Sequence, residues 1–576
     1  MIQKLFRRIT TTQIFNAMTS YLCLLIDSIV IGRLVGSDAM SAYGIAAPFL
    51  TIHTALQMMI VNGVQVPLGQ AIGRGDRDGM NKCYSSSITI AIAISVLSML
   101  LIFVAGNPLC SLLGAPEGEI LTLTGDYLRG YIIGAPFFFL GPLLNTYLQT
   151  LGKRKRVMSS VMTMIVVNTV GDLLSVFVFN GGMFGIGLVS SLSYFASCIV
   201  SFSEFLRKQS LFRLGKVSLG NIKETLYAGS SVLFNQAFVT VRTLVYNLLL
   251  LKLGGTDAVA AFAAYTTITN MMYTIGIGAG STVLMLSSIL YGEEDRDSIQ
   301  CLVKVMLQHT LLLTVLVILV SELLAPWILL LFLDPNLTDM AIPGLRLLMF
   351  SLIPNMLCNV FKFYFLGIKH TTINNLIAFL QHLGLNLPFI WLFSRLFGIN
   401  GIWLGAVVGQ FAALLFIFML CWHKFGRVSF SSAAFCYLDE DFGTKPEDYI
   451  IEKVSDIPGA VYASQKLCDF CNKKGLNTKI SMLVGLCVEE LCVNIIEYGF
   501  AGDDHLHNIE VRLVIEDDKK ILRICDDCIN FDPTDYVKLH QDKDLTAHIG
   551  LRMVMGMVKD AKYVNTLGLN NLTLVL

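Results

Sequence analysis

Two groups of polar residues in this chain have types and spacings that suit chemistry, and the first group lies in apolar surroundings. Asp27 interrupts one apolar run, and Asn168 and Asp172 lie four residues apart in another, so they share a helix face. A charge inside a membrane costs a few kcal/mol and indicates a function. Two carboxylates and an amide would bind a proton or a small cation, because like charges held close favour cation uptake. The alternative is that each Asp lies near a helix end, where water or the backbone satisfies it.

The second group lies near the C-terminus, in a more polar stretch. Glu490 and Asn494 are four residues apart in a predicted helix 478–499 and therefore project together. A carboxylate and an amide on one face can hold Mg²⁺ through waters and orient a nucleophile, although a solvated helix face often has the same pattern. Asp526 ends a predicted strand, and Gly550 opens a predicted helix.

The elements that carry these residues differ sharply before and after residue 430. The 576 residues are 54% hydrophobic and 15% charged, whereas soluble domains have about a quarter charged residues. Lipid-exposed backbone must satisfy its own hydrogen bonds, so the apolar segments are predicted to be helices. Roughly twelve have spanning length: 12–34, 45–70, 86–106, 128–150, 157–180, 185–206, 226–252, 260–290, 304–332, 341–366, 373–396 and 401–423.

Loop charges predict the orientation in the membrane. Most Lys and Arg fall in loops on the N-terminal side, which predicts that this side is cytoplasmic. The loops on the other side contain few: Arg33, Arg129, Lys252, Arg346 and Arg395. An even number of spans returns the chain to the cytoplasm, so we expect a multi-pass plasma-membrane protein with both termini cytoplasmic. The formal net charge of zero gives no reason to expect nucleic acid as a partner.

The membrane segments contain an internal repeat. Gly36-Ser37-Asp38-Ala39 returns as Gly255-Thr256-Asp257-Ala258, 219 positions later (255 − 36), and Asp76-Arg77-Asp78 returns as Asp295-Arg296-Asp297 at the same offset. Six spans per copy make the two copies parallel, which is typical of a transporter with a central cavity between two lobes. The second copy lacks the carboxylates, because Asp27 corresponds to Tyr246 and the Asn168/Asp172 region loosely to His382 and Asn386. Arg242 and Lys362 also fall within its spans, where each either lines the cavity, snorkels or pairs structurally.

Residues 1–425 resemble the multidrug and toxic compound extrusion (MATE) family of secondary transporters. The resemblance is carried by the stretches 26–39, Asn168-x-x-x-Asp172 and 397–403. It implies export of organic, often cationic, compounds in exchange for H⁺ or Na⁺. It also implies that Asp27, Asn168 and Asp172 couple transport to the cation, with Ser193 as a looser match to a family Thr.

The tail, about 440–576, resembles the GHKL ATP-binding fold, and within it the anti-sigma-factor serine kinases. Three stretches carry the resemblance: 494–500, 526–533 and 549–554. It implies that Asn494 holds Mg²⁺, that Glu490 is the base, and that Asp526 accepts a hydrogen bond from the adenine amino group. The backbone at Gly550, which opens a helix, would then face phosphate. No Gly-x-x-x-x-Gly-Lys-Ser/Thr loop occurs in the chain, so a P-loop motor is excluded.

Several tail residues depart from the GHKL pattern. Cys528 and His548 stand where Gly is expected, and Tyr498 stands where many members have His. Cys468-x-x-Cys471 and Cys525-x-x-Cys528 have the spacing of a four-thiolate zinc site, but we interpret them as reduced packing thiols. His505 and His507 lie in a polar turn and are predicted to be solvated.

The predicted fold class is an all-α membrane bundle of two six-helix repeats plus a cytoplasmic α+β GHKL-like sandwich. The predicted boundaries are 1–215 and 216–428 for the two lobes, 429–447 for a linker and 448–576 for the tail domain. The favoured function is a cation-coupled exporter of small organic cations, with lipid around it and a tail that binds ATP and Mg²⁺ or docks a cytoplasmic regulatory protein. The alternatives are a membrane-anchored serine kinase with the body as its sensor, and a transporter with a purely structural tail.

Overall fold

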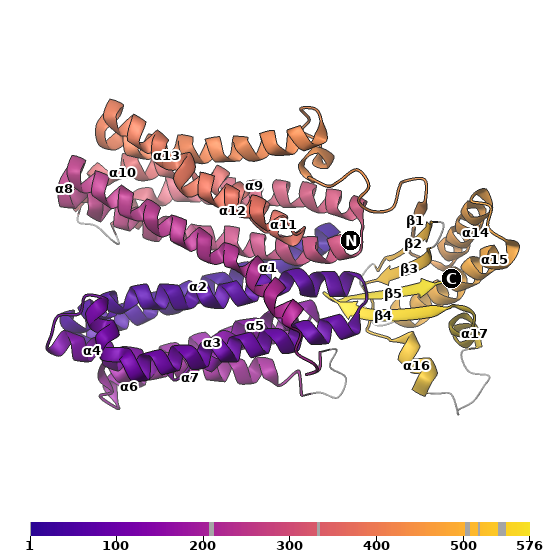
Figure 1. Cartoon of the computed structure of the whole chain (residues 1–576), viewed down its shortest axis with the longest axis horizontal. Helices are drawn as coiled ribbons and strands as arrows, with labels where there is room; N and C mark the ends of the chain where they lie inside the picture. The colour runs from indigo at the N-terminus through magenta and orange to yellow at the C-terminus, as the bar shows by residue number, and fades with distance from the viewer. Residues whose placement is uncertain (1, 207–211, 331–334, 501–506, 517–518, 540–548) are drawn as a thin grey trace.

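The computed structural model consists of a long helical body with a small sheet domain at one end (Figure 1). It describes every residue except 1, 207–211, 331–334, 501–506, 517–518 and 540–548. The first-lobe helices are α1 Ile2–Val30, continued by a π-helical turn Ile31–Val35, α2 Ser37–Gly73, α3 Arg77–Leu112, α4 Glu119–Ile132, α5 Ala135–Thr150, α6 Arg154–Phe177 and α7 Gly182–Phe202. The second-lobe helices are α8 Leu219–Gly292, α9 Arg296–Leu329, α10 Pro335–Met349, α11 Leu352–Gly367, α12 Thr371–Phe379, a π-helical turn Leu380–Gly384 and α13 Asn386–Phe425.

The number of spans follows from helix length and from two glycine kinks. In the described part of the chain, nine helices are long and apolar enough to cross a membrane, and the bent pair α4–α5 makes a tenth. The 74 residues of α8 would extend about 110 Å, against an apolar membrane core of about 30 Å. Gly255 (φ +67°) breaks α8, and Gly398 (φ +59°) breaks the run from Thr371 to Phe425, because glycine adopts this left-handed region without strain. Counting each kinked run as two spans is consistent with the twelve predicted.

The predicted fourth span, 128–150, is two helices and not one. The α4 and α5 axes differ by 46°. At the break, Gly134 lies so close to Ser191 that an added Cβ would be 2.5 Å from the Ser191 Cα atom. The Gly134 N–H donates to the Ser191 hydroxyl at 2.7 Å, which satisfies a backbone group that the break exposes.

The C-terminal domain is a five-stranded antiparallel sheet with helices on one face. Its elements are β1 Tyr449–Val454, α14 Ile457–Lys473, α15 Thr478–Asn494, a π-helical turn Ile495–Gly499, β2 Ile509–Ile515, β3 Lys520–Asp526, α16 Pro533–Leu539, α17 Ile549–Met557, β4 Asp560–Thr566 and β5 Leu569–Val575. The strand order is β1-β2-β3-β5-β4. Neither β1 nor α16 was expected from the sequence. The edge strand β1 pairs only with β2, and α16 is a short helix capped by Asp532, which accepts from the Thr534 N–H at 2.9 Å.

Alternation along the strands gives this sheet two different faces. Val511, Leu513 and Leu522 pack in the apolar core with α14, α15 and α17. Arg512 and Arg523, from alternate positions, project from the other face toward the helical body, where they pair with Asp295 and Glu293.

The segment predicted as a linker, 429–447, is anchored to the second lobe. It contains a 3₁₀ turn, Ser432–Phe435, and Phe435 and Cys436 are buried in the core of the body. The Tyr364 hydroxyl donates to the Cys436 carbonyl at 2.6 Å. The connection between body and tail domain is therefore a packed strap along this stretch.

Candidate functional site

The tertiary structure brings Asp27 and Asp172, the two carboxylates predicted within apolar segments, together inside the first lobe. Asp27 comes from α1, Asn168 and Asp172 from α6, and they are 4%, 2% and 0% exposed. The side chains of Asn168 and Asp172 lie within hydrogen-bonding reach of Asp27. The Ser190 hydroxyl of α7 donates to Asp27 Oδ2 at 3.4 Å. Residues 145 positions apart (172 − 27) thus form one buried cluster, within two helical turns of the C-terminal ends of α1 and α6.

The oxygen atoms of this cluster suit a small cation. Among the described residues, Asp27 Oδ1, Asn168 Oδ1 and both Asp172 oxygens are buried and have no hydrogen-bond partner. Leaving buried acceptors unsatisfied is costly, and two buried carboxylates cannot both stay ionised without a counter-charge. A proton would satisfy one of these oxygens. A hard cation such as Na⁺ would satisfy several of them, because hard cations prefer carboxylate and amide oxygens as ligands.

Ser193 lies next to this cluster without joining it. It is buried on α7, and its hydroxyl donates to the Ser190 carbonyl at 2.8 Å. The serine that contacts Asp27 is Ser190, three residues earlier. Sequence reasoning named only Ser193, because the direction of each side chain depends on the rotation of α7 about its axis.

The second lobe has different chemistry at the corresponding positions. The Tyr246 hydroxyl donates to Asn386 Oδ1 at 3.1 Å, and both residues are buried. Lys362 is 5% exposed and donates to Asn235 Oδ1 at 2.9 Å, so it does not snorkel to the membrane surface. Arg242 donates to a ring nitrogen of His382 at 3.1 Å.

In the tail domain, Asp526 lies in a buried polar network at the end of β3. Its Oδ1 atom accepts from the Cys528 N–H at 2.9 Å and from the Asn570 amide at 2.7 Å. Burial raises the pKa of Asp526 above its ordinary value, and these hydrogen bonds oppose the rise. Tyr563 donates to Asn570 Oδ1 at 2.6 Å, which fixes the direction of the amide. Sequence reasoning missed Asn570. This residue lies directly opposite Asp526 where β3 pairs with β5.

The other two tail motifs meet along α15. A Cβ atom added to Gly550 would lie 1.8 Å from a carboxylate oxygen of Glu490, so the first turn of α17 rests directly on this side chain. Asn494 is half-buried one turn further along α15. The chain then passes Gly499, whose added Cβ would be 3.1 Å from Cys528 Cβ in the turn after Asp526. A helix N-terminus such as that of α17 can bind a phosphate, but in this structure the Glu490 carboxylate occupies the space beside Gly550.

The remaining tail predictions have mixed outcomes. His507 is buried and pairs with Asp527 at 3.1 Å, so the prediction that it is solvated was wrong; the folded domain brings the two together across 20 residues. His505 and His548, with the lid stretch before Gly550, lie outside the described residues. Within the described chain, one group of three metal-ligating side chains has its ligand atoms within 4.8 Å of one another: His507, Asp527 and Cys528. Of the four thiols, only Cys528 belongs to it.

Comparison with known families decides the identity of the body. The family model described as MatE matches residues 13–174 and 232–392, which is more than half of the chain.

This chain belongs to the MatE family.

The two matched stretches begin 219 positions apart (232 − 13), the same offset as the repeated loops of this MatE chain. A second family model, described as a histidine kinase-like ATPase domain, matches residues 460–576. The chain therefore joins a MatE body to a histidine kinase-like ATPase domain.

Individual relatives of the MatE body are distant. The multidrug export protein MepA of Staphylococcus aureus is 22% identical over 402 residues, covering 68% of this chain and 88% of the relative. The outward-facing structure of a multidrug resistance MATE family transporter of the MOP superfamily has a TM-score of 0.68 at 20% identity, covering 72% of this chain and 94% of the other. A MOP superfamily transporter from Pyrococcus furiosus has a TM-score of 0.67 at 20% identity, with coverage of 72% and 94%. At these identities the structures show a common fold.

The ATPase-like domain docks on the end of the MatE body where the chain also begins (Figure 1). Both repeated loops take part. From the first lobe, Arg77 donates to Asp532 at 3.1 Å and to the Tyr563 carbonyl at 2.8 Å. From the second lobe, Asp295 pairs with Arg512 at 2.5 Å.

Further contacts extend this docking surface over both lobes. Glu293 pairs with Arg523 at 3.1 Å in the second lobe. In the first lobe, the Leu567 N–H of the β4–β5 turn donates to the Thr150 carbonyl at 2.6 Å. An added Cβ on Gly152 would lie 2.5 Å from Gly568 N. The ATPase-like domain thus bridges the two lobes of the MatE body.

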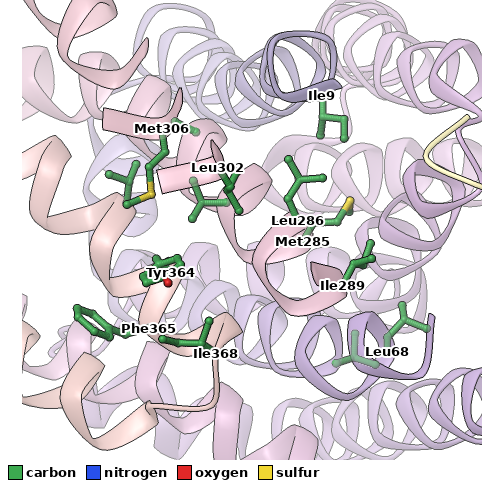
Figure 2. Close-up of a cluster of buried hydrophobic side chains, with 14 of the residues drawn as sticks. Ile9, Leu68, Met285, Leu286, Ile289, Leu302, Met306, Tyr364, Phe365 and Ile368 are labelled. Carbon is green, nitrogen blue, oxygen red and sulfur yellow. The ribbon is translucent and has the colours of Figure 1, made fainter. Parts of the chain in front are cut away.

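The two lobes are packed tightly against each other at this same end. In Figure 2, Ile9 and Leu68 of the first lobe lie near Met285, Leu286 and Ile289 of the second in one apolar cluster. The helices α2 and α8 approach at backbone distance, because an added Cβ on Gly73 would lie 2.3 Å from the Ile289 carbonyl oxygen. The packing of α2 against α8 therefore closes the predicted cavity between the two lobes at the end near the ATPase-like domain.

Proposed function

We propose that this protein is a secondary active exporter of small organic compounds, driven by exchange for H⁺ or Na⁺ and regulated by ATP bound to its C-terminal domain. The observation that carries the transport proposal is the buried Asp27–Asn168–Asp172 cluster, whose acceptor atoms have no partner among the described residues. The MatE relatives named as multidrug export proteins support export of organic compounds. The family resemblance suggests that these compounds are cationic.

The first-lobe carboxylates would couple the two fluxes. Asp27 and Asp172 compete for one counter-charge because each is buried and close to the other. Uptake of a cation from the side where it is abundant neutralises the pair, and its release on the other side restores the repulsion. Asn168 and Ser190 orient Asp27 toward this cation.

We propose that the end bearing the ATPase-like domain faces the cytoplasm, with both termini on that side. The support is the excess of Lys and Arg in the loops at this end of a plasma-membrane protein. The docked domain then bridges the lobes where they are closed, so it would stabilise the outward-open state of the transporter.

In the ATPase-like domain, the proposed roles follow the geometry around α15. Asp526 would accept from the adenine amino group, and Asn494 would hold Mg²⁺. The N-terminus of α17 at Gly550 would face the phosphates, which supply the charge that the bound metal balances. Glu490, which rests against Gly550, would have to move aside or act as a base toward an attacking hydroxyl.

Transport is tested in vesicles that contain the full-length protein and an imposed H⁺ or Na⁺ gradient. Asp27→Asn and Asp172→Asn should each abolish gradient-driven dye export, whereas Asp38→Asn, in the exposed first turn of α2, should leave it unchanged. Export that persists in both cluster variants would refute cation coupling through this site.

Nucleotide binding is tested on the same full-length protein. ATP with Mg²⁺ should bind, and Asn494→Ala should weaken binding by about tenfold or more, as expected for loss of a metal ligand contact. Absence of ATP binding would leave a structural role for the domain. Transfer of labelled phosphate from ATP to a serine of an added protein would favour the membrane-anchored serine kinase.

A further inference from the structure

The second lobe contains a buried group of cationic and polar side chains that the cation-coupling site does not use. Asn235 and Arg242 lie seven residues apart on one face of α8. Lys362 comes from α11, and His382 from the π-helical turn that follows α12. We call these four residues the basic cluster.

The hydrogen bonds of the basic cluster fix its charge state. Arg242 can only donate, so His382 Nδ1, 3.1 Å away, accepts. His382 Nε2 then carries the hydrogen and donates to Asn235 Oδ1 at 3.2 Å. The same Asn235 oxygen accepts from Lys362 at 2.9 Å. His382 is therefore a neutral link between the Arg242 guanidinium, which stays charged, and the Asn235 amide that accepts from Lys362.

The basic cluster has no carboxylate to balance it. Within the described chain, neither Arg242 nor Lys362 forms an ion pair with an acidic side chain, whereas Glu322, an acidic residue within the second-lobe spans, pairs with Arg346 at 3.5 Å. Buried cations are normally paired, because an isolated charge in a membrane interior is costly. Because no described acidic side chain pairs with Arg242 or Lys362, an anionic group of a ligand would supply the counter-charge of the basic cluster.

The basic cluster lies near the boundary between the two lobes. The Tyr273 hydroxyl of α8 donates to Asn359 Oδ1 at 2.6 Å, one helical turn before Lys362 on α11. The same helix α8 packs against α1 of the first lobe, because an added Cβ on Gly278 would lie 2.5 Å from Ile14 N. Arg242 is itself partly exposed, so the basic cluster is not sealed from a ligand.

We propose that Arg242 and Lys362 bind a carboxylate or phosphate group of the exported compound, so that the substrates are organic anions or zwitterions. This substrate class rests on the proposed transport function and differs from the organic cation that the family resemblance suggests. It also explains why the two lobes carry opposite charges. The first lobe supplies carboxylates for the coupling cation, and the second supplies cations for the substrate.

The test uses two dyes that share a xanthene core, anionic fluorescein and cationic rhodamine 123, with the full-length protein in phosphatidylcholine vesicles. Fluorescein should bind and be exported, and Lys362→Met and Arg242→Gln should each weaken its binding about tenfold or more, the typical loss for one charge-assisted contact. Lys362→Arg, which keeps the charge, should retain most of the binding. Lys252→Gln removes an exposed cation from the same helix α8 and should have no effect.

The outcomes separate this inference from the transport proposal. If rhodamine 123 is exported along the gradient but fluorescein affinity is equal in the wild type and Lys362→Met, the anion site is refuted and the exporter stands. If neither dye moves, the exporter itself is refuted. If added phosphatidylglycerol displaces fluorescein from the wild type and from Lys252→Gln alike, the basic cluster holds a lipid headgroup and the proposed substrate class is refuted.

Discussion

Docking of the ATPase-like domain depends most on one buried ion pair, between Arg512 of β2 and Asp295 at the start of α9. The side chains are 9% and 8% exposed, and their charged atoms are 2.5 Å apart. Removing one partner of a buried pair leaves the other charge unpaired and costs about 3–5 kcal/mol. Arg512→Met keeps the apolar stem of the side chain and removes its charge. Because 1.4 kcal/mol corresponds to tenfold, the ratio of docked to released domain should fall by roughly 100-fold or more.

Hydrogen exchange on the full-length protein measures this ratio. The Leu567 N–H crosses the docking surface to the Thr150 carbonyl, so its exchange rate reports release of the domain. The Leu522 N–H lies inside the sheet and reports unfolding of the domain itself. In Arg512→Met, Leu567 should exchange about 100-fold or more faster, and Leu522 should be unchanged.

Two further variants make the result decisive. Asp295→Asn should behave like Arg512→Met, because Asn still caps α9 through its side-chain oxygen but cannot balance the arginine. Lys4→Met removes a cation that is 69% exposed, so the loss should stay within about 1 kcal/mol, or roughly fivefold. If Leu567 exchange is no faster in Arg512→Met than in Lys4→Met, the buried pair does not hold the domain and the reasoning is wrong.

Three more outcomes are expected. Asp526→Asn should abolish ATP binding, and in the wild type titration calorimetry should show affinity falling as the pH is lowered, since only the ionised carboxylate accepts from adenine. Because burial raises the pKa of Asp526, this loss should begin above the ordinary Asp value of about 3.9. Gly550→Ala should push the Glu490 carboxylate aside, because its Cβ would lie 1.8 Å from a Glu490 oxygen at the end of a flexible side chain, so ATP affinity should be equal in Gly550→Ala and in Gly550→Ala with Glu490→Ala. Gly69→Val should slow dye export, because even a Cβ there would lie 2.0 Å from the Ser288 hydroxyl of α8 in the closed arrangement, whereas Gly44→Val, with open space around it, should not.

The internal repeat shows how a sequence pattern gains meaning from the fold. The sequence revealed two copies of Asp-Arg-Asp and no reason for them. In the structure, Asp76 and Asp295 each cap the following helix, accepting from the Gly79 and Ser298 N–H groups. The repeated Asp therefore caps the N-terminus of an equivalent helix in each lobe. The same two loops also contact the ATPase-like domain.

The sequence by itself determined the broad architecture, because hydropathy and helix length act locally along the chain. It placed the apolar spans, the change of character near residue 430, the three tail motifs and the coupling candidates Asp27, Asn168 and Asp172. It missed β1 and α16, since short elements at a domain edge have weak periodicity. It also predicted one continuous span at 128–150, because a close approach between Gly134 and Ser191 has no local signal.

The tertiary structure alone decided which distant side chains meet. Arg512 and Asp295 are 217 positions apart (512 − 295), and only the packing of one domain on the other turns two ordinary charges into a buried pair. The choice of Ser190 over Ser193 depends on the rotation of one helix. The basic cluster around Lys362 depends on three elements converging where none of the described carboxylates forms an ion pair with its cations. Apolar spans follow from composition, but charge pairing inside a membrane depends on geometry, because the cost of a buried charge is set by its nearest neighbours.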